Sequence, residues 1–294
     1  MTGTSVKKIR RALLRWFAQT KRDLPWRHTS NPYRILVSEV MLQQTQVDRV
    51  KPKYEAFLKR WPTVRHLARA RRSSVVRQWA GLGYNRRAVQ LHRAAKAIVA
   101  EHNGIVPRTV AELEQLPGIG PYTARAVLSF AHNASHAFID TNVRRVVGRV
   151  ALGTHFPTPN DDRVIRSQAE RLAPKQHAGA WHAGLMDLGA TVCKPKPLCP
   201  VCPLQSWCRA YPTILRKPQK RPARRQVPFA DSNRYWRGQI VSLLRHASGD
   251  GRTVAELRKR LSRLLPKERV ETLLHGLQKD GLVETRGRRY QLTN

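Results

Sequence analysis

All four cysteines of the 294-residue chain lie in one short stretch, CKPKPLCPVCPLQSWC. They are Cys193, Cys199, Cys202 and Cys208, so one C-x-x-C pair is flanked by two five-residue gaps. In a reducing compartment disulfides are disfavoured, and four thiolates suit either a zinc ion or a [4Fe–4S] cluster. Zinc ribbons usually carry two C-x-x-C pairs far apart in the sequence. The spacing here favours a single loop around a cluster, with zinc and unliganded core cysteines as the alternatives.

Most of the chain before residue 210 shows apolar residues at helical spacing, as in VKKIRRALLRWFAQT. Similar patterns cover residues 64–83 and 86–104. A capping box, Thr109 to Glu112, opens the segment TVAELEQL. Almost nothing alternates with a period of two before residue 280. The sequence therefore predicts an all-α main body.

The composition changes in the last third of the chain. The segment RKPQKRPARRQVP is basic, proline-rich and without apolar periodicity, which predicts a linker over residues 216–233. Residues 234–294 then show three helical patterns, the second opened by a capping box from Thr253 to Glu256, followed by a hairpin pattern in LVETRGRRYQL. This order predicts a winged helix-turn-helix, a module that binds duplexes or docks proteins. An inert helical cap is the alternative.

The chain is extremely basic. Lys and Arg number 55 against 19 Asp and Glu, which gives a net charge of +36, and the excess is spread along the whole length. So large a charge of one sign favours a polyanionic partner, nucleic acid before a membrane surface, over a merely solvated basic surface. No stretch approaches the roughly 20 apolar residues of a membrane span, and MTGTSVKKIR lacks the apolar core of a signal peptide. We expect a cytoplasmic, nucleoid-associated protein.

The segment LPGIGPYTARAV contains two glycines, Gly118 and Gly120, between two helical patterns. Glycines at this spacing allow a tight turn whose backbone N–H groups face outward, and the following helix N-terminus adds its positive end. Most lone G-x-G segments are ordinary turns. In so basic a chain, the flanking helices favour a helix–hairpin–helix that binds a DNA phosphate.

One carboxylate occupies an improbable position. Glu39, in YRILVSEVMLQQTQV, is the only ionisable residue between Ile35 and Val47. Burying a carboxylate among aliphatic side chains is costly unless it is paired, hydrogen-bonded or protonated. We therefore expect a functional role for Glu39.

A second acid, Asp140 in AFIDTNVRRVVGRV, precedes a helical pattern. Taken alone, an Asp at such a boundary is most often an N-cap. Pairs of carboxyl groups in different environments cleave glycosidic bonds, one protonating the leaving group and the other stabilising positive charge. Glu39 suits the first role, and Asp140, near Arg144 and Arg145, suits the second.

Taken together, these segments resemble the helix–hairpin–helix DNA glycosylases of the endonuclease III superfamily, most closely the MutY-type adenine glycosylases. The likeness runs from about residue 8 to 215 and includes RDLPWR, WAGLGYNRRAVQLHRAA, IDTNVRRV and GLMDLGATVC in the order of that family. It implies a two-lobed fold with a DNA-binding cleft. The barrel lobe would cover about residues 28–137, and the cluster lobe residues 1–27 with 138–215. The four cysteines would bind a [4Fe–4S] cluster.

The resemblance also implies roles for individual residues. Glu39 would protonate a flipped adenine, its pKa raised by desolvation, and would later help to position water. Asp140 would stabilise, or transiently bond, the deoxyribose cation, and Asn142 would help to hold that site together. Tyr122 stands where lyase members carry a lysine nucleophile, which implies hydrolysis without a Schiff base. The base pocket would be lined by Arg22, Leu24 and Trp26. The base stack near the opposite base would be contacted by Gln44, Thr45, Leu82 and Tyr84.

The expected function is removal of adenine opposite 8-oxoguanine or guanine in double-stranded DNA, by a monomer, in base excision repair. Thymine or uracil mismatch glycosylases also carry a tyrosine at the Tyr122 position but tend to lack LQQTQ, which is intact here. A non-catalytic DNA-binding regulator is the alternative from another class. Two departures stand out: the gap in CKPKPLC is one residue shorter than usual in the family, and the tail is too short for a Nudix-like domain.

Overall fold

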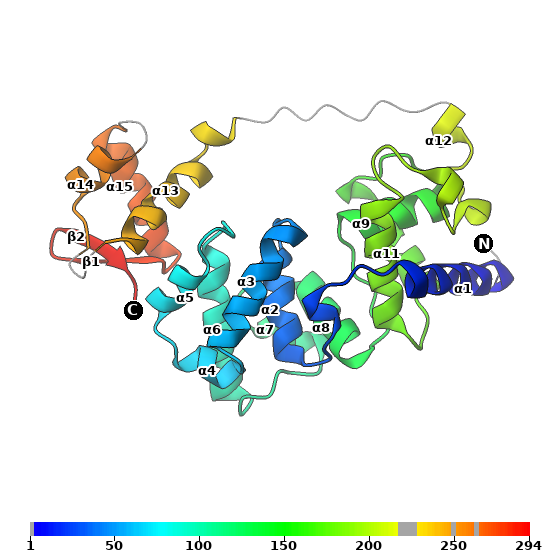
Figure 1. Ribbon diagram of the computed structural model, residues 1–294, viewed down its shortest axis with the longest axis horizontal. Coiled ribbons are helices and arrows are strands. Elements are labelled where there is room, and N and C mark those ends of the chain that lie inside the picture. The colour runs from blue at the N-terminus through cyan, green and yellow to red at the C-terminus, as the bar shows by residue number, and fades with distance from the viewer. Residues whose placement is uncertain (1–2, 217–227, 248–250, 262–264) are drawn as a thin grey trace. The chain divides into compact units, whose positions relative to one another are not determined.

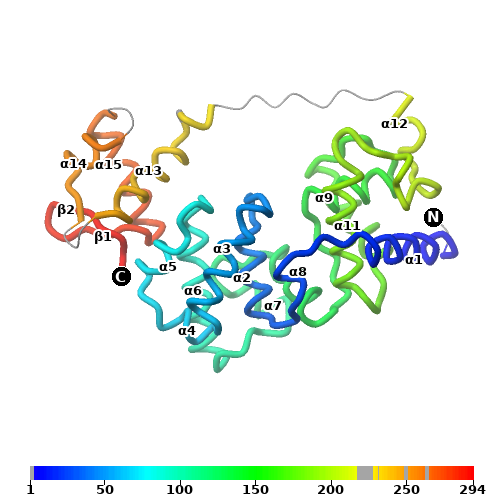
Figure 2. The backbone as a smooth tube through the Cα atoms, viewed as in Figure 1, coloured from blue at the N-terminus to red at the C-terminus, as the bar shows by residue number. Residues whose placement is uncertain are grey.

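The computed structural model describes residues 3–216, 228–247, 251–261 and 265–294 (Figure 1). Figure 2 traces the same backbone. The chain divides into two compact units, each assembled from segments far apart in the sequence. The first unit consists of Met1–Leu36, Arg108–Glu114 and Ile119–Ala223, and the second of Val37–Pro107, Gln115–Gly118 and Arg224–Asn294.

The described part of the first unit is helical. Its helices are α1 (Gly3–Thr20), α7 (Val110–Gln115, which ends in the second unit), α8 (Pro121–His132), α9 (Thr141–Val147), α10 (Asp162–Leu172), α11 (Ala178–Thr191) and α12 (Thr213–Arg216). A π-helical turn, η2 (Gly148–Leu152), continues α9. Short 3₁₀ turns are η1 (Pro25–Arg27), η3 (Pro159–Asp161), η4 (Cys199–Val201) and η5 (Gln205–Trp207).

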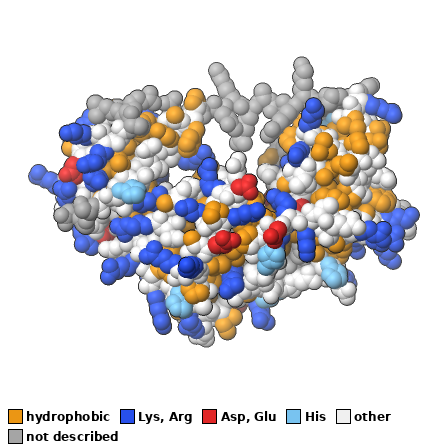
Figure 3. Space-filling view, in the orientation of Figure 1, with side chains coloured by type: hydrophobic (Ala, Val, Ile, Leu, Met, Phe, Trp, Pro, Cys, Tyr) orange, Lys and Arg blue, Asp and Glu red, His pale blue; other side chains and the backbone are white. Residues whose placement is uncertain are grey.

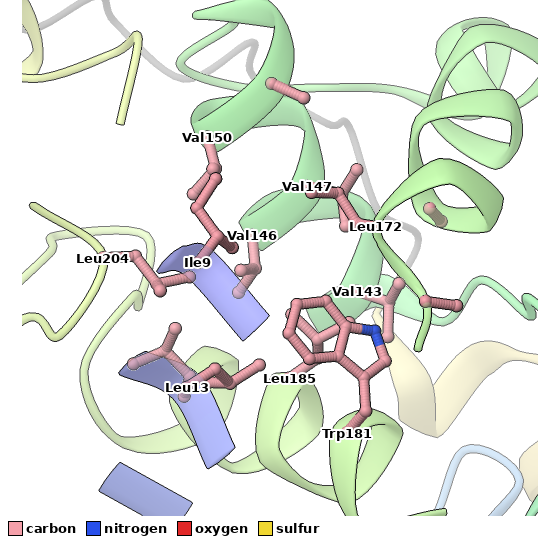
Figure 4. Packing of buried hydrophobic residues seen from close by; sticks show 14 of the residues in the cluster. Ile9, Leu13, Val143, Val146, Val147, Val150, Leu172, Trp181, Leu185 and Leu204 are labelled. Atoms are coloured by element: carbon pink, nitrogen blue, oxygen red, sulfur yellow. The ribbon is translucent and has the colours of Figure 1, made fainter. Parts of the chain in front are cut away.

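One apolar core joins α1, α9 and α11. The buried residues of α1 recur every three or four positions and so form one face of the helix. Figure 4 shows Ile9 and Leu13 of this face in the same cluster as Val146, Trp181 and Leu185. All five side chains are at most 2% exposed. The amino-terminal helix is thereby fixed against helices from much later in the sequence.

The second unit begins within α2 (Pro32–Leu42), whose first residues belong to the first unit. Helices α4 and α5 pack against α6. The unit's further helices before residue 108 are α3 (Val47–Arg60), α4 (Val64–Arg69), α5 (Arg72–Gln78) and α6 (Arg86–Glu101).

The helical pattern over residues 64–83 is interrupted between α4 and α5. Ala70 and Arg71 have extended backbone, with ψ of 147° and 132°. The buried ring of His92 on α6 lies 2.9 Å, Nε2 to O, from the carbonyl of Ala70. A continuous helix would use that carbonyl for its own ladder, so the packing of α6 favours the break.

The described part of the chain after residue 228 contains three helices followed by a two-stranded hairpin. The helices are α13 (Asn233–Arg245), α14 (Val254–Arg260) and α15 (Lys267–Lys279), preceded by the 3₁₀ turn η6 (Phe229–Asp231). Strands β1 (Val283–Arg286) and β2 (Arg289–Leu292) pair antiparallel, with Val283 opposite Leu292. The capping box of Thr253 and Glu256 is present at α14. We call residues 232–294 the carboxy-terminal module, and its element order is the predicted one.

The fold class is confirmed as predominantly α-helical with one small sheet. Of the predicted linker at 216–233, residues 217–227 lie outside the described part of the chain. Among the helices that the structure describes, none has the length and apolar character to cross a bilayer. Figure 3 shows Lys and Arg side chains scattered over the visible face, with few Asp and Glu among them.

Candidate active site

Glu39 lies on α2 and is buried, with 4% of its surface exposed. Its helical neighbours Leu36, Val37, Val40 and Met41 are each at most 3% exposed. Acidic residues are rarely buried to this degree. The predicted burial of this carboxyl group among aliphatic side chains is therefore confirmed.

Asp140 is the N-cap of α9. Its Oδ1 accepts hydrogen bonds from the backbone N–H groups of Asn142 (2.9 Å) and Val143 (2.6 Å), and its Oδ2 accepts one from Asn142 Nδ2 (2.9 Å). Burial raises the pKa of Asp140, while these hydrogen bonds and the charge of Arg145 act in the opposite direction. The carboxylate is both a structural cap and a desolvated group held in one orientation.

Asn142 is itself fixed by Arg145. Arg145 Nη2 donates to Asn142 Oδ1 at 2.8 Å and to the carbonyl of Gly189 on α11 at 2.6 Å. A Cβ on Gly189 would lie 2.6 Å from Asn142 Cβ, so only glycine permits this approach of α11 to α9. Arg144, by contrast, forms a bidentate ion pair with Asp162 at 2.5 and 2.7 Å. Of the two predicted arginines, Arg145 is thus the one that holds the Asp140 site together.

Tyr122 lies in the first turn of α8 and is half-buried. Its ring meets the ring of Phe138 edge-on, with centroids 5.3 Å apart. Phe138 precedes Asp140 by two residues, so this contact brings the start of α8 to the segment that carries Asp140. Glu39 belongs to the second unit, whereas Tyr122, Asp140 and Asn142 belong to the first.

The predicted hairpin turn connects α7 to α8. Gly118 has φ of 78°, and a Cβ there would lie 2.5 Å from Gln90 Cβ, so this position requires glycine twice over. Gly120 is the N-cap of α8, with Pro121 at the first helical position. Nothing lies within 4 Å of where a Cβ of Gly120 would be. Gly118 therefore shapes the turn, while Gly120 leaves open space at the N-terminus of α8.

Of the three predicted base-pocket residues, Leu24 and Trp26 are buried side chains, and Arg22 belongs to an ion-pair network around the buried Asp187. Leu24 and Trp26 are buried, at 3% and 9% exposure. Arg22 Nε donates to Asp187 Oδ1 at 2.6 Å, and Arg27 donates to both oxygens of Asp187 at 2.6 and 2.8 Å. Although burial acts to raise it, the pKa of Asp187 is lowered, because Arg27 and Arg22 stabilise the ionised form.

The sequence did not lead us to predict a role for Asp187 or Arg27. Asp187 is the only acid in the apolar helix α11 and is 1% exposed. The signal that singled out Glu39, a lone carboxylate in an apolar helix, is equally present here. Its partners reveal a structural role: it fixes the segment after α1 against α11.

The predicted stack-contacting residues lie on two loops, 43–46 and 79–85, which the structure brings together. Thr45 Oγ1 donates to the carbonyl of Leu82 at 3.3 Å. Gln44 and Tyr84 have positive φ, 54° and 45°, and Gln44 is exposed. Leu82 is 2% exposed, so its side chain packs inward here. We call residues 79–85 the probe loop.

Arg87 joins these two loops and was not predicted. Its Nη1 donates to the carbonyls of Val40, Met41 and Gln43 at 2.7–2.8 Å, which satisfies the free C-terminal carbonyls of α2. Its Nη2 donates to Thr45 Oγ1 at 2.9 Å and to Leu82 O at 3.1 Å. Burial lowers the pKa of Arg87 to about 10, so it stays charged at neutral pH.

The four cysteines line one pocket with apolar residues of η2 and α11. Burial raises the pKa of the Cys199 and Cys208 thiols, and that of Cys202 to about 12. Within the described ranges, no three His, Cys, Asp or Glu side chains converge closely enough to hold one metal ion. Four thiols that line one pocket form a donor set that fits either a [4Fe–4S] cluster or a zinc ion.

The shortened first gap of the cysteine loop is held by Arg149 of η2. This side chain is 1% exposed, and its Nη1 donates to Lys194 O at 2.6 Å and lies 3.5 Å from Cys193 Sγ. Its Nη2 donates to Pro195 O at 3.1 Å and its Nε to His155 O at 2.9 Å. A π-helical turn often marks a functional position, and here it places this buried cation.

Comparisons with known proteins agree with this geometry. The HhH-GPD superfamily of base excision DNA repair proteins matches residues 37–174. The adenine DNA glycosylase of Mycolicibacterium smegmatis is 45% identical over 238 residues, covering 80% of each chain. The adenine DNA glycosylase of Homo sapiens is 42% identical over 216 residues, covering 70% of this chain and 40% of the human protein.

Solved structures show the same fold. A thermostable thymine-DNA glycosylase aligns with a TM-score of 0.65 and 31% identity, covering 70% of this chain and 95% of that one. Endonuclease III in a non-covalent DNA complex aligns with a TM-score of 0.63 and 23% identity, covering 74% of this chain and 100% of that one. The chain belongs to the HhH-GPD superfamily of base excision DNA repair proteins and, within it, to the adenine DNA glycosylases.

Proposed function

We propose that the protein removes adenine mispaired with 8-oxoguanine or guanine from double-stranded DNA, by hydrolysing the N-glycosidic bond of a flipped-out base and acting as a monomer. The observation that carries the proposal is the burial of Glu39, at 4% exposure, on a helix of aliphatic residues. A carboxyl group in that setting retains its proton more readily than one in water, as a general acid near neutral pH must.

The two acids take different roles. Glu39 protonates the adenine, which makes the purine a better leaving group, and general acid catalysis of this kind contributes about 10²- to 10⁴-fold. In the proposed mechanism Asp140 is ionised, and three hydrogen bonds hold its two oxygens in place, which suits it to stabilise an oxocarbenium-like sugar. Asn142 keeps that carboxylate oriented.

The phenol of Tyr122 supports hydrolysis without a Schiff base. A Schiff base requires an amine, and at this position the chain has none. Water is therefore the proposed nucleophile, and the product an abasic site in an unbroken strand.

Cys193, Cys199, Cys202 and Cys208 are the proposed ligands of a [4Fe–4S] cluster. Their shared pocket and their thiol chemistry fit that group. When bound, the cluster supplies four metal–thiolate bonds that close the loop. Arg149 and Arg145 then hold the loop's first cysteine against η2 and α9.

A thymine or uracil mismatch glycosylase is the second candidate. It is favoured by the likeness to the thermostable thymine-DNA glycosylase, at 31% identity. The intact LQQTQ segment and the relatives named adenine DNA glycosylase favour adenine instead. A DNA-binding regulator without catalysis is less well supported, because it gives the buried Glu39 no task.

The test is base release from a panel of duplexes under single-turnover conditions. We expect free adenine from duplexes with adenine opposite 8-oxoguanine or guanine, and no adduct on borohydride treatment. Glu39→Gln should bind these duplexes and lose at least about 10²-fold in rate. Glu101→Gln, at an exposed position on α6, is the matched control. Release of thymine or uracil alone would establish the second candidate, and binding without any release would establish the regulator.

A further inference from the structure

The carboxy-terminal module is anchored beside the probe loop by a half-buried cation. Arg245, the last residue of α13, donates from Nε to the carbonyl of Val76 at 3.1 Å and from Nη2 to Asn85 Oδ1 at 2.7 Å. Val76 lies on α5, which precedes the probe loop, and Asn85 ends it. The guanidinium of Arg245 therefore joins the module both to the helix before the loop and to the last residue of the loop.

A second cation of α13 contacts the loop itself. The guanidinium carbon of Arg234 lies 4.6 Å from the centroid of the Tyr84 ring, and Arg234 Nη1 donates to the Tyr84 hydroxyl. The guanidinium of Arg87 lies 5.5 Å from the same centroid. Both groups are placed for cation–π attraction, so the orientation of Tyr84 depends on one residue of the barrel and one of the module.

Other contacts spread the attachment over a wider face of the module. Ser73, which is 3% exposed, donates from Oγ to Asn294 Oδ1 at 2.8 Å. Arg86 Nε lies 3.5 Å from Asp280 Oδ1 at the end of α15. Contacts from α13, from the end of α15 and from the last residue of the chain show that the module packs on α5 and α6 as a body.

The probe loop needs such external support. Gly81, Gly83 and Tyr84 all have positive φ, of 88°, 70° and 45°. For tyrosine, which has a Cβ, this left-handed conformation is unfavourable, and it persists only where the surroundings impose it. Arg87 supports the loop from the barrel side, and Arg245 and Arg234 support it from the module.

We propose that the carboxy-terminal module is a positioning element for the probe loop, with Arg245 fixing the helix before the loop and the loop's last residue, and Arg234 fixing the ring of Tyr84. The role of Tyr84 beside the opposite base rests on the proposed function, whereas the attachment of the loop to the module does not. The module thereby sharpens recognition of the mispair without contributing a catalytic group.

The first experiment measures hydrogen exchange of the amides in residues 79–85 in the full-length protein without DNA. Arg245→Ala should speed their exchange by about tenfold, because it removes two hydrogen bonds from a charged donor. Arg245→Lys should restore part of the protection, since its ammonium can still donate to one acceptor. Arg288→Ala, in the exposed turn of the hairpin, removes the same charge and should leave the loop unchanged.

The second experiment measures affinity for DNA. Arg234→Ala changes an exposed residue and should not affect folding. It therefore keeps the proposal testable if Arg245→Ala fails to fold. In the Glu39→Gln background it should weaken binding to a duplex with an adenine–guanine mispair by about fivefold, an effect of the size of an exposed cation–π contact. Binding to a fully paired duplex should fall no more than in Arg288→Ala, and Arg234→Lys should recover part of the loss.

The proposal would be overturned if neither Arg245→Ala nor Arg234→Ala changed the hydrogen exchange of residues 79–85. It would also be overturned if Arg234→Ala lost equal affinity for paired and mispaired DNA. Tighter mispair binding by Arg234→Ala would also overturn it, because the contact would then be autoinhibitory. If the unaltered protein releases no adenine from any duplex, the proposed function fails. The exchange experiment would still report whether the module holds the loop.

Discussion

Arg145 Nε donates a hydrogen bond to the backbone carbonyl of Cys193 at 2.6 Å. The same guanidinium holds Asn142, which in turn binds Asp140. Cys193 and Asp140 are therefore connected by three hydrogen bonds that pass through two residues, Arg145 and Asn142. A change in either place has a direct route to the other.

Replacing Arg145 should disturb both the start of the cysteine loop at Cys193 and the site around Asp140. Arg145→Ala removes hydrogen bonds to Cys193 O, Gly189 O and Asn142 Oδ1, and hydrogen bonds from charged donors contribute about 1.5–3 kcal/mol each. We expect a clear fall in the free energy of unfolding and in single-turnover excision. Arg163→Ala, at an exposed position on α10, is the control for charge. Normal excision by Arg145→Ala would show that Asn142 needs no support.

The two roles of Asp140 can be separated by substitution. Asparagine is as good an N-cap as aspartate, whereas alanine is not, and loss of a cap costs about 1 kcal/mol. Asp140→Asn should therefore keep the thermal stability and abolish excision, while Asp140→Ala should lose both. Calorimetry and single-turnover assays on the two variants make the comparison. Substantial excision by Asp140→Asn would leave Asp140 as a cap alone.

The two glycines of the hairpin should respond differently to alanine. Gly118→Ala places a Cβ 2.5 Å from Gln90 Cβ at a positive φ and should lower the melting temperature markedly. Gly120→Ala meets nothing within 4 Å and should fold normally. If a phosphate approaches the backbone there, Gly120→Ala should weaken DNA binding. Equal DNA affinity of Gly120→Ala and the unaltered protein would move the phosphate elsewhere.

Acid should destabilise the protein through two buried histidines. Burial lowers the pKa of His92 and of His182 to about 4, from an ordinary value near 6.5. The unfolded chain therefore takes up protons first as the pH falls below about 6.5, so stability is complete above that pH and declines toward pH 4. Each histidine contributes a slope of at most about 1.4 kcal/mol per pH unit.

Urea unfolding between pH 7 and 4 measures this decline. His182→Asn, which loses a ring stacked 4.3 Å from that of Phe138, should be less stable at pH 7 but should show a shallower pH dependence. The exposed His275→Gln on α15 should keep the original slope. An unchanged slope in His182→Asn would mean that its titration is not linked to folding.

The cysteine pocket should contain iron rather than zinc. Protein purified without air should contain iron and acid-labile sulfide in about equal amounts and show visible absorption. Chelation of the metal should lower the melting temperature, because it removes the metal–thiolate bonds that would cross-link the loop 193–208. Stoichiometric zinc without sulfide would replace the cluster by a single-ion site.

Much of this arrangement could be predicted from the sequence, because it depends on local rules. The burial of Glu39 followed from its aliphatic neighbours, and the capping box at Thr253 from the preference of its residues. The break at Ala70 could not be predicted, since it depends on His92 from another helix. The inward packing of Leu82 likewise depends on contacts that only the folded chain makes.

The arginines that bind backbone carbonyls from other segments, one buried and three half-buried, were the hardest residues to identify. Arg87, Arg145, Arg149 and Arg245 each join distant carbonyls, yet in a chain with 55 Lys and Arg nothing local separates them from solvated ones. Asp187 could have been found, because it is the only acid of an apolar helix. Its neighbours in sequence carried the same signal as those of Glu39.

The hydrogen bonds from Arg149 to the segment between Cys193 and Cys199 have a consequence for engineering. The guanidinium donates to the carbonyls of Lys194 and Pro195, so the backbone path of that gap depends on the residue at position 149. A cysteine loop with a longer first gap would place these carbonyls elsewhere and would lose their hydrogen bonds to Arg149. An exchange of the cysteine loop between homologues should therefore include the π-helical turn η2, which carries Arg149.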